Sequence, residues 1–472
     1  MKWFKLFLLN FVGVLNDNFM KHCIIFVSVG WIMPEWMTQS QLISAVSAAL
    51  VLPYLLLSPY SGEIAERFQK QKIVRLMKLM EIPIVALAGV GFWIESVWIV
   101  LLAVLLMGTQ SCLYSPAKYG LIRDVEGEKG VAFGSGMFEM MAFLGILIGT
   151  VLAAYLSDHY AWWIVAVIMI VLAIIGFILS KILGIVETQY IASQALKANP
   201  KVETQYIASQ ALKANPKVEP QYIASQTLKA NPKVETQYIA SQTLKAKSKV
   251  ETQYIASPQE QNSRPQNFAS LHLLNPIRFL IASYQFASQY NGLNLAIYGA
   301  SLLWLLGGLL QMNVVLHCTR TLGMTNTQSS IILSMAAVGI AIGCSVAGKL
   351  IENRNKQNFI IGGLIGVALA LIIVLIFKPE GWALGVLIFL IAFCGGIFQV
   401  PCLAIVQSAD IGRKLGSMLA YLNLLTFIFV LIGTVIFSIV TVFTNQSSYA
   451  VFVVMLIITL LSLVLFILKD RE

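Results

Sequence analysis

The chain has 472 residues, of which 58% are hydrophobic and only 11% are charged, and its mean hydropathy is +0.79. Soluble domains carry about 25% charged residues, so this composition excludes an ordinary water-soluble protein. The net charge of +10 would suit a nucleic-acid partner, but the positions of the basic residues argue for membrane topology and for no nucleic acid.

Long apolar runs recur along the chain, each enough to cross about 30 Å of hydrocarbon. The runs are continuous rather than alternating, so they predict helices and not barrel strands. We expect an all-α membrane protein with twelve transmembrane helices in two six-helix bundles, at residues 4–32, 41–61, 73–94, 97–122, 132–157, 160–184, 293–317, 328–351, 358–377, 381–406, 414–440 and 446–468. The first run lacks a small-residue cleavage site, which argues against a signal peptide.

The first predicted helix contains a polar cluster, made of Asn16, Asp17, Asn18 and Lys21. Placing ionisable groups inside the hydrocarbon core of a membrane costs free energy unless they pair or face water. Such groups therefore usually mark a substrate or ion pathway. The alternative is a structural pair between Asp17 and Lys21, which are four residues apart on one helix.

Later helices add four polar candidates to this pathway: Lys118, Glu139, Gln399 and Asn423. A lysine and a carboxylate in one bundle can bind the two charges of a zwitterionic substrate. The alternative is that Lys118 and Glu139 pair with each other as a structural contact. Asp17 and Glu139 can also bind a coupling proton or sodium ion.

Basic residues concentrate in alternate loops, after the even-numbered helices. The loop after the second helix contains Arg67 and Lys70, and the loop after the fourth contains Arg123, whereas the opposite loops contain few basic residues apart from Arg320 and Lys378. The positive-inside rule then places both termini in the cytoplasm.

A tandem repeat separates the two groups of six helices. Residues 186–265 repeat the 16-residue unit VETQYIASQALKANPK, with few large apolar residues and a helix-stopping Asn-Pro in each of the first three copies. We interpret residues 186–270 as a flexible cytoplasmic linker between an N-terminal bundle (1–185) and a C-terminal part (271–472). The C-terminal part begins with an amphipathic segment at residues 271–286, predicted to lie on the membrane surface. A docking array for a partner is the alternative for the repeats.

Motifs of enzymes and metal sites are missing from the sequence. The six cysteines show no CxxC spacing, no histidine precedes an aspartate by four residues, and no GxxxxGK[ST] phosphate loop occurs. We therefore predict no enzyme activity, no metal and no cofactor.

The loops after the second and eighth helices share a pattern: Gly, three residues, Glu, then Arg. Gly62, Glu66 and Arg67 form the first copy. The second copy consists of Gly348, Glu352 and Arg354. The pair resembles the loop motif of the major facilitator superfamily, which implies a gate formed between two bundles. An ordinary charged turn is the alternative for either copy alone.

Four further stretches resemble the lysophospholipid transporter group, including the membrane domain fused to 2-acylglycerophosphoethanolamine acyltransferase. They are residues 11–19 (FVGVLNDNF), 114–120 (YSPAKYG), 138–145 (FEMMAFLG) and 395–401 (GGIFQVP). The resemblance implies that Asp17, Asn18, Lys118 and Glu139 occupy the polar positions of the family motifs.

The same resemblance implies a function: a secondary transporter moves lysophospholipid, typically lysophosphatidylethanolamine, across the cell inner membrane by alternating access. A separate cytoplasmic acyltransferase would then re-acylate it. Two alternatives remain, namely a carrier for another small amphiphile or metabolite, and a membrane scaffold or sensor that uses the repeats.

Overall fold

A computed structural model describes residues 2–28, 31, 39–183, 275–351 and 354–469. The chain divides into two compact units, Met1–Gly184 with Ala269–Glu472, and Ile185–Phe268. All described residues belong to the first unit. The predicted repeat linker lies outside the described residues, so its flexibility and cytoplasmic position stay predictions.

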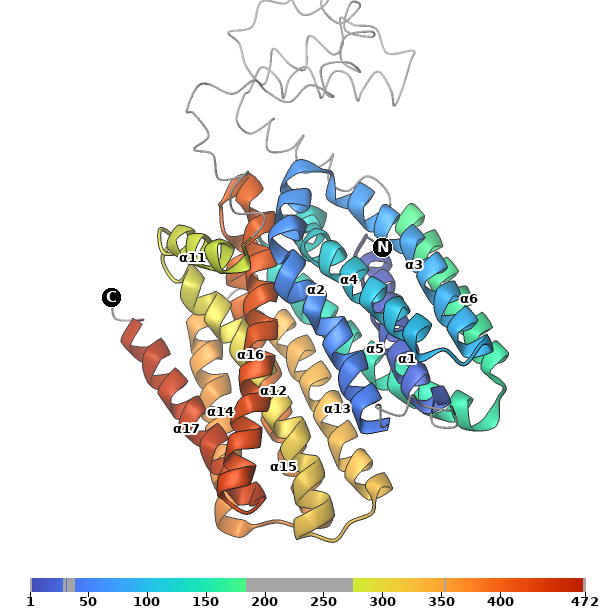
Figure 1. Ribbon diagram of the computed structural model, residues 1–472. Helices are drawn as coiled ribbons and strands as arrows, with labels where there is room; N and C mark the ends of the chain where they lie inside the picture. Colours follow the sequence, from blue (N-terminus) through green and yellow to red (C-terminus); the bar gives the residue numbers. More distant parts are fainter. Residues whose placement is uncertain (1, 29–30, 32–38, 184–274, 352–353, 470–472) are drawn as a thin grey trace, which may run out of the picture. The chain divides into compact units, whose positions relative to one another are not determined.

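The described residues form an all-α unit of twelve long helices and one short helix (Figure 1). The first six are α1 (Lys2–Val27), α2 (Gln39–Arg67), α3 (Lys70–Trp93), α4 (Val97–Glu126), α5 (Val131–His159) and α6 (Trp162–Ile182). The short helix α11 (Pro276–Ala287) follows. The second six are α12 (Leu293–Leu316), α13 (Asn326–Leu350), α14 (Lys356–Phe377), α15 (Gly381–Ser408), α16 (Leu415–Phe443) and α17 (Ser448–Lys469).

Ten of the long helices are apolar and long enough to cross a membrane. The other two, α1 and α3, contain several charged and amide side chains and lie within the same bundle as α4 and α5. The predicted all-α class is thus confirmed. Many helices extend beyond the predicted apolar runs, since a helix continues into charged residues such as those that end α2 and α4.

The two groups of six helices lie side by side, with α2 against α16 and α5 against α13 (Figure 1). We call the end of the unit where α1 begins and α2 ends the near end, and the opposite end the far end. Each bundle has its own apolar core, around Phe19 and Phe92 in the first and around Phe398 and Phe452 in the second.

Glycines bring α1 and α5 into backbone contact. A Cβ atom on Gly145 would lie 3.0 Å from the carbonyl oxygen of Phe11, and one on Gly149 would lie 2.6 Å from that of Leu15. Small residues at this spacing allow close packing of membrane helices. Gly145 and Gly149 therefore allow α1 to pack closely against α5.

The short helix α11 overlaps the predicted amphipathic segment, of which residues 271–274 lie outside the described ranges. Asn275 caps it, because its side-chain oxygen accepts hydrogen bonds from the backbone amides of Ile277 and Arg278. Phe279 and Ala287 are buried against the unit, whereas Ile277 and Ile281 are exposed. Its amphipathic character and its place on the membrane surface stay predictions.

Candidate functional site

The polar cluster of α1 faces α4 inside the first bundle. Asp17 is half-buried, and its Oδ2 accepts a hydrogen bond of 3.0 Å from the Ser111 hydroxyl. Its other oxygen, Oδ1, is buried and has no hydrogen-bond partner. Among the described residues neither Asp17 nor Lys21 forms an ion pair, so the structural Asp17–Lys21 pair is not present.

Behind Asp17, a fully buried ion pair joins two residues of α3. Lys78 Nζ lies 2.5 Å from Glu81 Oε2, and the two side chains are only 2% and 1% exposed. Glu81 Oε1 accepts a hydrogen bond of 2.6 Å from Asn16 Nδ2, which ties the pair to the neighbour of Asp17. A Cβ atom on Gly13 would lie 2.6 Å from Lys78 Nζ, so α1 has no side chain where the ammonium approaches.

The sequence analysis did not select Lys78. The available signal was the spacing of three residues between a lysine and a glutamate within an otherwise apolar run. Removing one partner of such a buried ion pair strongly destabilises the folded protein, because the other charge stays buried without a counter-ion. The structural role of Glu81 therefore includes holding Asn16.

Lys118 of α4 lies in an aromatic environment, half-buried and without a carboxylate partner in the described part of the chain. Its Nζ donates a hydrogen bond of 3.4 Å to Asn10 Oδ1. The same ammonium lies between 5.2 and 5.6 Å from the ring centres of Tyr119, Tyr114 and Phe138. The aromatic faces stabilise the cation and leave it available to an anion.

Glu139 of α5 is 2% exposed, and its Oε1 accepts a hydrogen bond of 2.9 Å from the Tyr119 hydroxyl. It forms no ion pair with Lys118 among the described contacts, so the structural pairing of these two residues is not observed. Tyr119 instead lies between them, because its ring contacts the Lys118 ammonium and its hydroxyl binds Glu139.

The remaining pathway candidates occupy different places. Asn18 Nδ2 donates to the carbonyl oxygen of Val14 within α1. Gln399 of α15 is buried in the second bundle, and its Oε1 has no hydrogen-bond partner. Asn423 of α16 donates a hydrogen bond of 2.9 Å to Ser115 Oγ of α4. Asn423 thus joins the two bundles through Ser115, which lies three residues before Lys118 on α4.

The first gating motif contacts the second bundle at the near end. A Cβ atom on Gly62 would lie 2.9 Å from Ser417 Cα, so α2 and α16 approach closely there. Glu66 accepts hydrogen bonds from the Ser417 hydroxyl and from Lys414 Nζ, the latter at 3.2 Å. Arg67 is exposed and pairs with Glu63 of its own helix. Among the described contacts, the glutamate of the motif bridges the bundles and the arginine does not.

In the second gating motif only the glycine has a described contact with the other bundle. A Cβ atom on Gly348 would lie 3.0 Å from Gly136 Cα of α5. Arg354 is exposed, and Glu352 lies outside the described residues. The two copies of the motif share the close glycine contact, while the bridge through a carboxylate is seen in the first.

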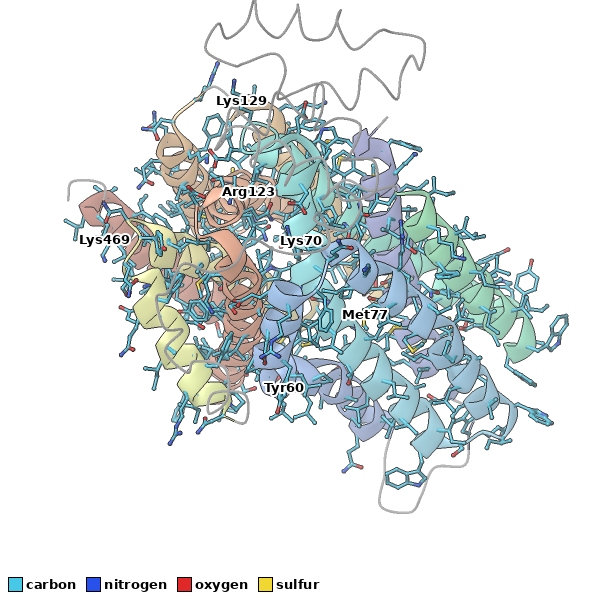
Figure 2. The ribbon with its side chains drawn as sticks, turned by 90° about the horizontal axis from the view of Figure 1, so that it is seen from above. Tyr60, Lys70, Met77, Arg123, Lys129 and Lys469 are labelled. Carbon is cyan, nitrogen blue, oxygen red and sulfur yellow. The ribbon has the colours of Figure 1, made fainter. Side chains whose placement is uncertain are left out.

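A second near-end bridge, not selected from the sequence, is formed by Arg123 of α4. This side chain is 6% exposed, and its Nη1 donates a hydrogen bond of 2.6 Å to the carbonyl oxygen of Ala409, just after α15. Beside it, Lys70 Nζ lies 2.7 Å from Asp124 Oδ2. Figure 2 looks onto this end, with Lys70 and Arg123 near the middle of the face.

Chemically, the described contacts of the first bundle leave Asp17 Oδ1 without a hydrogen-bond donor, and the half-buried ammonium groups of Lys21 and Lys118 without a carboxylate. Within the described ranges, no group of three or more His, Cys, Asp or Glu side chains is placed to hold a metal ion. The arrangement suits the binding of a molecule that carries both an anion and a cation.

Curated relatives match most of the chain. The sequence is 24% identical over 419 residues to "Lysophospholipid transporter LplT" of Photorhabdus laumondii, covering 88% of this chain and 82% of that protein. It is 25% identical over 421 residues to the protein of the same name from Shigella flexneri, with the same two coverages.

Solved structures share the fold at low sequence identity. A bacterial homologue of the iron transporter ferroportin, in an outward-facing state, superposes with a TM-score of 0.64 at 13% identity, and all of both chains is covered. The human organic anion transporter MFSD10 gives a TM-score of 0.65 at 12% identity, covering 98% of this chain and 99% of that one.

The sequence pattern of the Major Facilitator Superfamily matches residues 6–409 and 291–472, which together extend over almost the whole chain. This match agrees with the two six-helix groups and with the gating motif after α2. The chain therefore belongs to the Major Facilitator Superfamily and is a multi-pass membrane transporter, not an enzyme.

Proposed function

We propose that this transporter moves a lysophospholipid, with lysophosphatidylethanolamine as its preferred cargo, across the cell inner membrane by alternating access. The cargo would be re-acylated by a separate cytoplasmic acyltransferase. The single observation that carries the proposal is that Asp17 and Lys118 lie in one bundle with opposite charges and without an ion-pair partner. The names of the relatives that match 88% of the chain support the same cargo.

The headgroup of this cargo has a phosphate and an ammonium, separated by two carbon atoms. The Lys118 ammonium would bind the phosphate, and Asp17 Oδ1, which has no hydrogen-bond donor, would accept from the headgroup ammonium. The acyl chain needs apolar surface, such as the rings of Phe143 and Trp304, which stack at 5.9 Å between the bundles.

Alternating access would require the near-end bridges to open and reform. Glu66 with Lys414, and Arg123 with the Ala409 carbonyl, are the contacts that would break. Asp17 and Glu139 are the carboxyl groups at which a coupling proton or sodium ion would bind. In the orientation that we propose, the near end and both termini are cytoplasmic.

Uptake into proteoliposomes tests the proposal. We expect the purified full-length chain to take up labelled lysophosphatidylethanolamine, with sugars and drugs failing to compete. Asp17→Asn and Lys118→Ala should assemble normally but lose uptake by a factor of ten or more, since each removes one charge-assisted contact of roughly 1.5–3 kcal/mol. Lys181→Met is the matched control, because Lys181 is exposed and contacts only the Phe177 ring among the described contacts.

A double exchange, Asp17→Lys with Lys118→Asp, separates substrate contact from structural pairing. A normally expressed but inactive exchange variant agrees with direct contact with the headgroup. Restored uptake would instead assign the two charges to structure, and full uptake by both single variants would remove them from the mechanism.

A further inference from the structure

One face of α1 carries a line of polar residues directed at α4. Asn10, Asp17 and Lys21 fall, together with the apolar Val14, on one stripe of a helix with 3.6 residues per turn. Two contacts fix the direction of this stripe: Asn10 Oδ1 accepts from Lys118, and Asp17 Oδ2 accepts from Ser111. Lys21, one turn beyond Asp17, shares this direction.

The other faces of α1 are occupied by other helices. The α5 glycines pack on Phe11 and Leu15, and Asn16 binds Glu81 of α3. The Lys21 side chain is half-buried on the stripe between these two faces. It is therefore placed on the line that already contains Asp17 and the partner of Lys118.

The order of charges along this line follows from the antiparallel course of α1 and α4. The step from Asn10 to Asp17 is seven residues on α1, and the step from Lys118 back to Ser111 is seven residues on α4. From the near end to the far end the charges are Lys118, Asp17 and Lys21. Asp17 and Lys21 are separated by about 6 Å along the helix axis.

Among the described residues Lys21 forms no ion pair, and the carboxylate next to it along the stripe is Asp17, one turn away. Toward the far end, the bundle has no Asp or Glu in residues 39–62 of α2, 97–111 of α4, 140–157 of α5 or 162–182 of α6. Two other lysines of this bundle, Lys70 and Lys78, are paired with Asp124 and Glu81. A half-buried ammonium without a counter-ion is unfavourable within a membrane unless an anion or water reaches it.

We propose that Lys21 is a second phosphate-binding station at the far-end side of Asp17, where the substrate phosphate binds before it reaches Lys118. The inference rests on the proposed function and deepens it. With the phosphate on Lys21, the substrate ammonium lies at Asp17. When the phosphate moves to Lys118, the ammonium stays at Asp17, so the headgroup turns about that carboxylate. Such a reversal is what a lipid headgroup needs when it passes from one leaflet to the other.

Kinetics of Lys21→Met in proteoliposomes test this station, since methionine keeps an unbranched side chain but removes the charge. We expect KM to rise about tenfold, equal to about 1.4 kcal/mol, with kcat changed far less. Lysophosphatidylglycerol, which has the phosphate but no ammonium, should show the same loss. Lys21→Arg should restore KM. Lys5→Met is the matched control, because Lys5 is on another face of α1 and donates to the Ile182 carbonyl oxygen.

Chemical rescue keeps the test decisive if Lys21→Met assembles poorly. Lys21→Cys treated with 2-aminoethyl methanethiosulfonate regains a positive charge at this position and should regain low KM, with treated wild-type protein as the reference. Wild-type uptake together with unchanged KM in Lys21→Met, or failed rescue of Lys21→Cys, would overturn the station alone. A wild-type protein that takes up no lysophospholipid would instead overturn the proposed function.

Discussion

The two bundles contain the same number of long helices but differ in what they bury. The first buries five charged side chains: Lys78, Glu81, Arg123, Asp124 and Glu139. The buried polar residues described in the second are amides, hydroxyls and one histidine, His317. Burying charge within a membrane protein is expensive and is usually tied to function. The charged side chains that the described residues bury therefore lie in the first bundle, whereas the second buries neutral polar and apolar side chains.

This division agrees with an amphiphilic cargo. The charged end of the cargo would bind one bundle, and its acyl chain would contact apolar faces. Substitutions of polar residues should therefore have larger effects on stability and transport in the first bundle than in the second. The difference between these effects measures how far the two bundles differ in role.

The largest expected effect is on the buried pair of α3. Lys78→Met leaves Glu81 buried without a counter-ion, so the free energy of unfolding should fall by roughly 3–5 kcal/mol. Denaturant unfolding of the detergent-solubilised protein measures this change. Replacing both partners, Lys78→Met with Glu81→Leu, should recover most of the loss. A single variant as stable as the wild type would show that the charges of the first bundle are not coupled as the structure indicates.

An intermediate effect is expected at the near end, where Glu66 of the first bundle contacts the second bundle. Glu66→Ala removes the contacts to Lys414 and Ser417 and should shift the conformational balance toward an open near end by about 1–3 kcal/mol. Spin-label distances between α2 and α16 report this balance. Arg67→Ala is the control, because Arg67 is exposed and pairs only with Glu63 among the described residues. An equal shift from Arg67→Ala would contradict the assignment of the bridge to Glu66.

The smallest effect is expected from the second bundle. Asn423→Ala removes one neutral hydrogen bond to Ser115, which is worth about 1 kcal/mol. Lysophospholipid uptake should therefore fall less than in Asp17→Asn, as measured in the same proteoliposome assay. A loss as complete as that of Asp17→Asn would place a binding group in the second bundle and erase the division.

Much of the architecture was accessible from the sequence, because long apolar runs in lipid leave the backbone only the helix. The polar residues at positions 17, 118 and 139 were also identifiable, since charges are rare in such runs. The residues that these side chains contact could not be identified from the sequence. The spacing of Lys78 and Glu81 indicates their pair within α3, but it does not say which neighbouring helix the pair contacts, so the hydrogen bond from Asn16 to Glu81 could not be deduced.

In the loop motif after α2, the sequence likewise does not indicate which residue contacts the other bundle. Glu66 and Arg67 are adjacent, yet one faces α16 and the other faces outward, because neighbouring helical residues point about 100° apart. Both residues lie in the last turn of α2. The rotation of α2 about its own axis decides which of the two charged residues faces the second bundle. The spacing of residues in the sequence does not determine this rotation.

The missing side chain at Gly13 gives the first bundle an unexpected vulnerability. A methyl group there would lie 2.6 Å from Lys78 Nζ, so the ammonium that pairs with Glu81 would have to shift, although no charged residue had been altered. A substitution that looks conservative by size and polarity would then act on the buried ion pair. Position 13 belongs to the electrostatics of this transporter, and variation at that position is better interpreted together with residues 78 and 81 than with its apolar neighbours on α1.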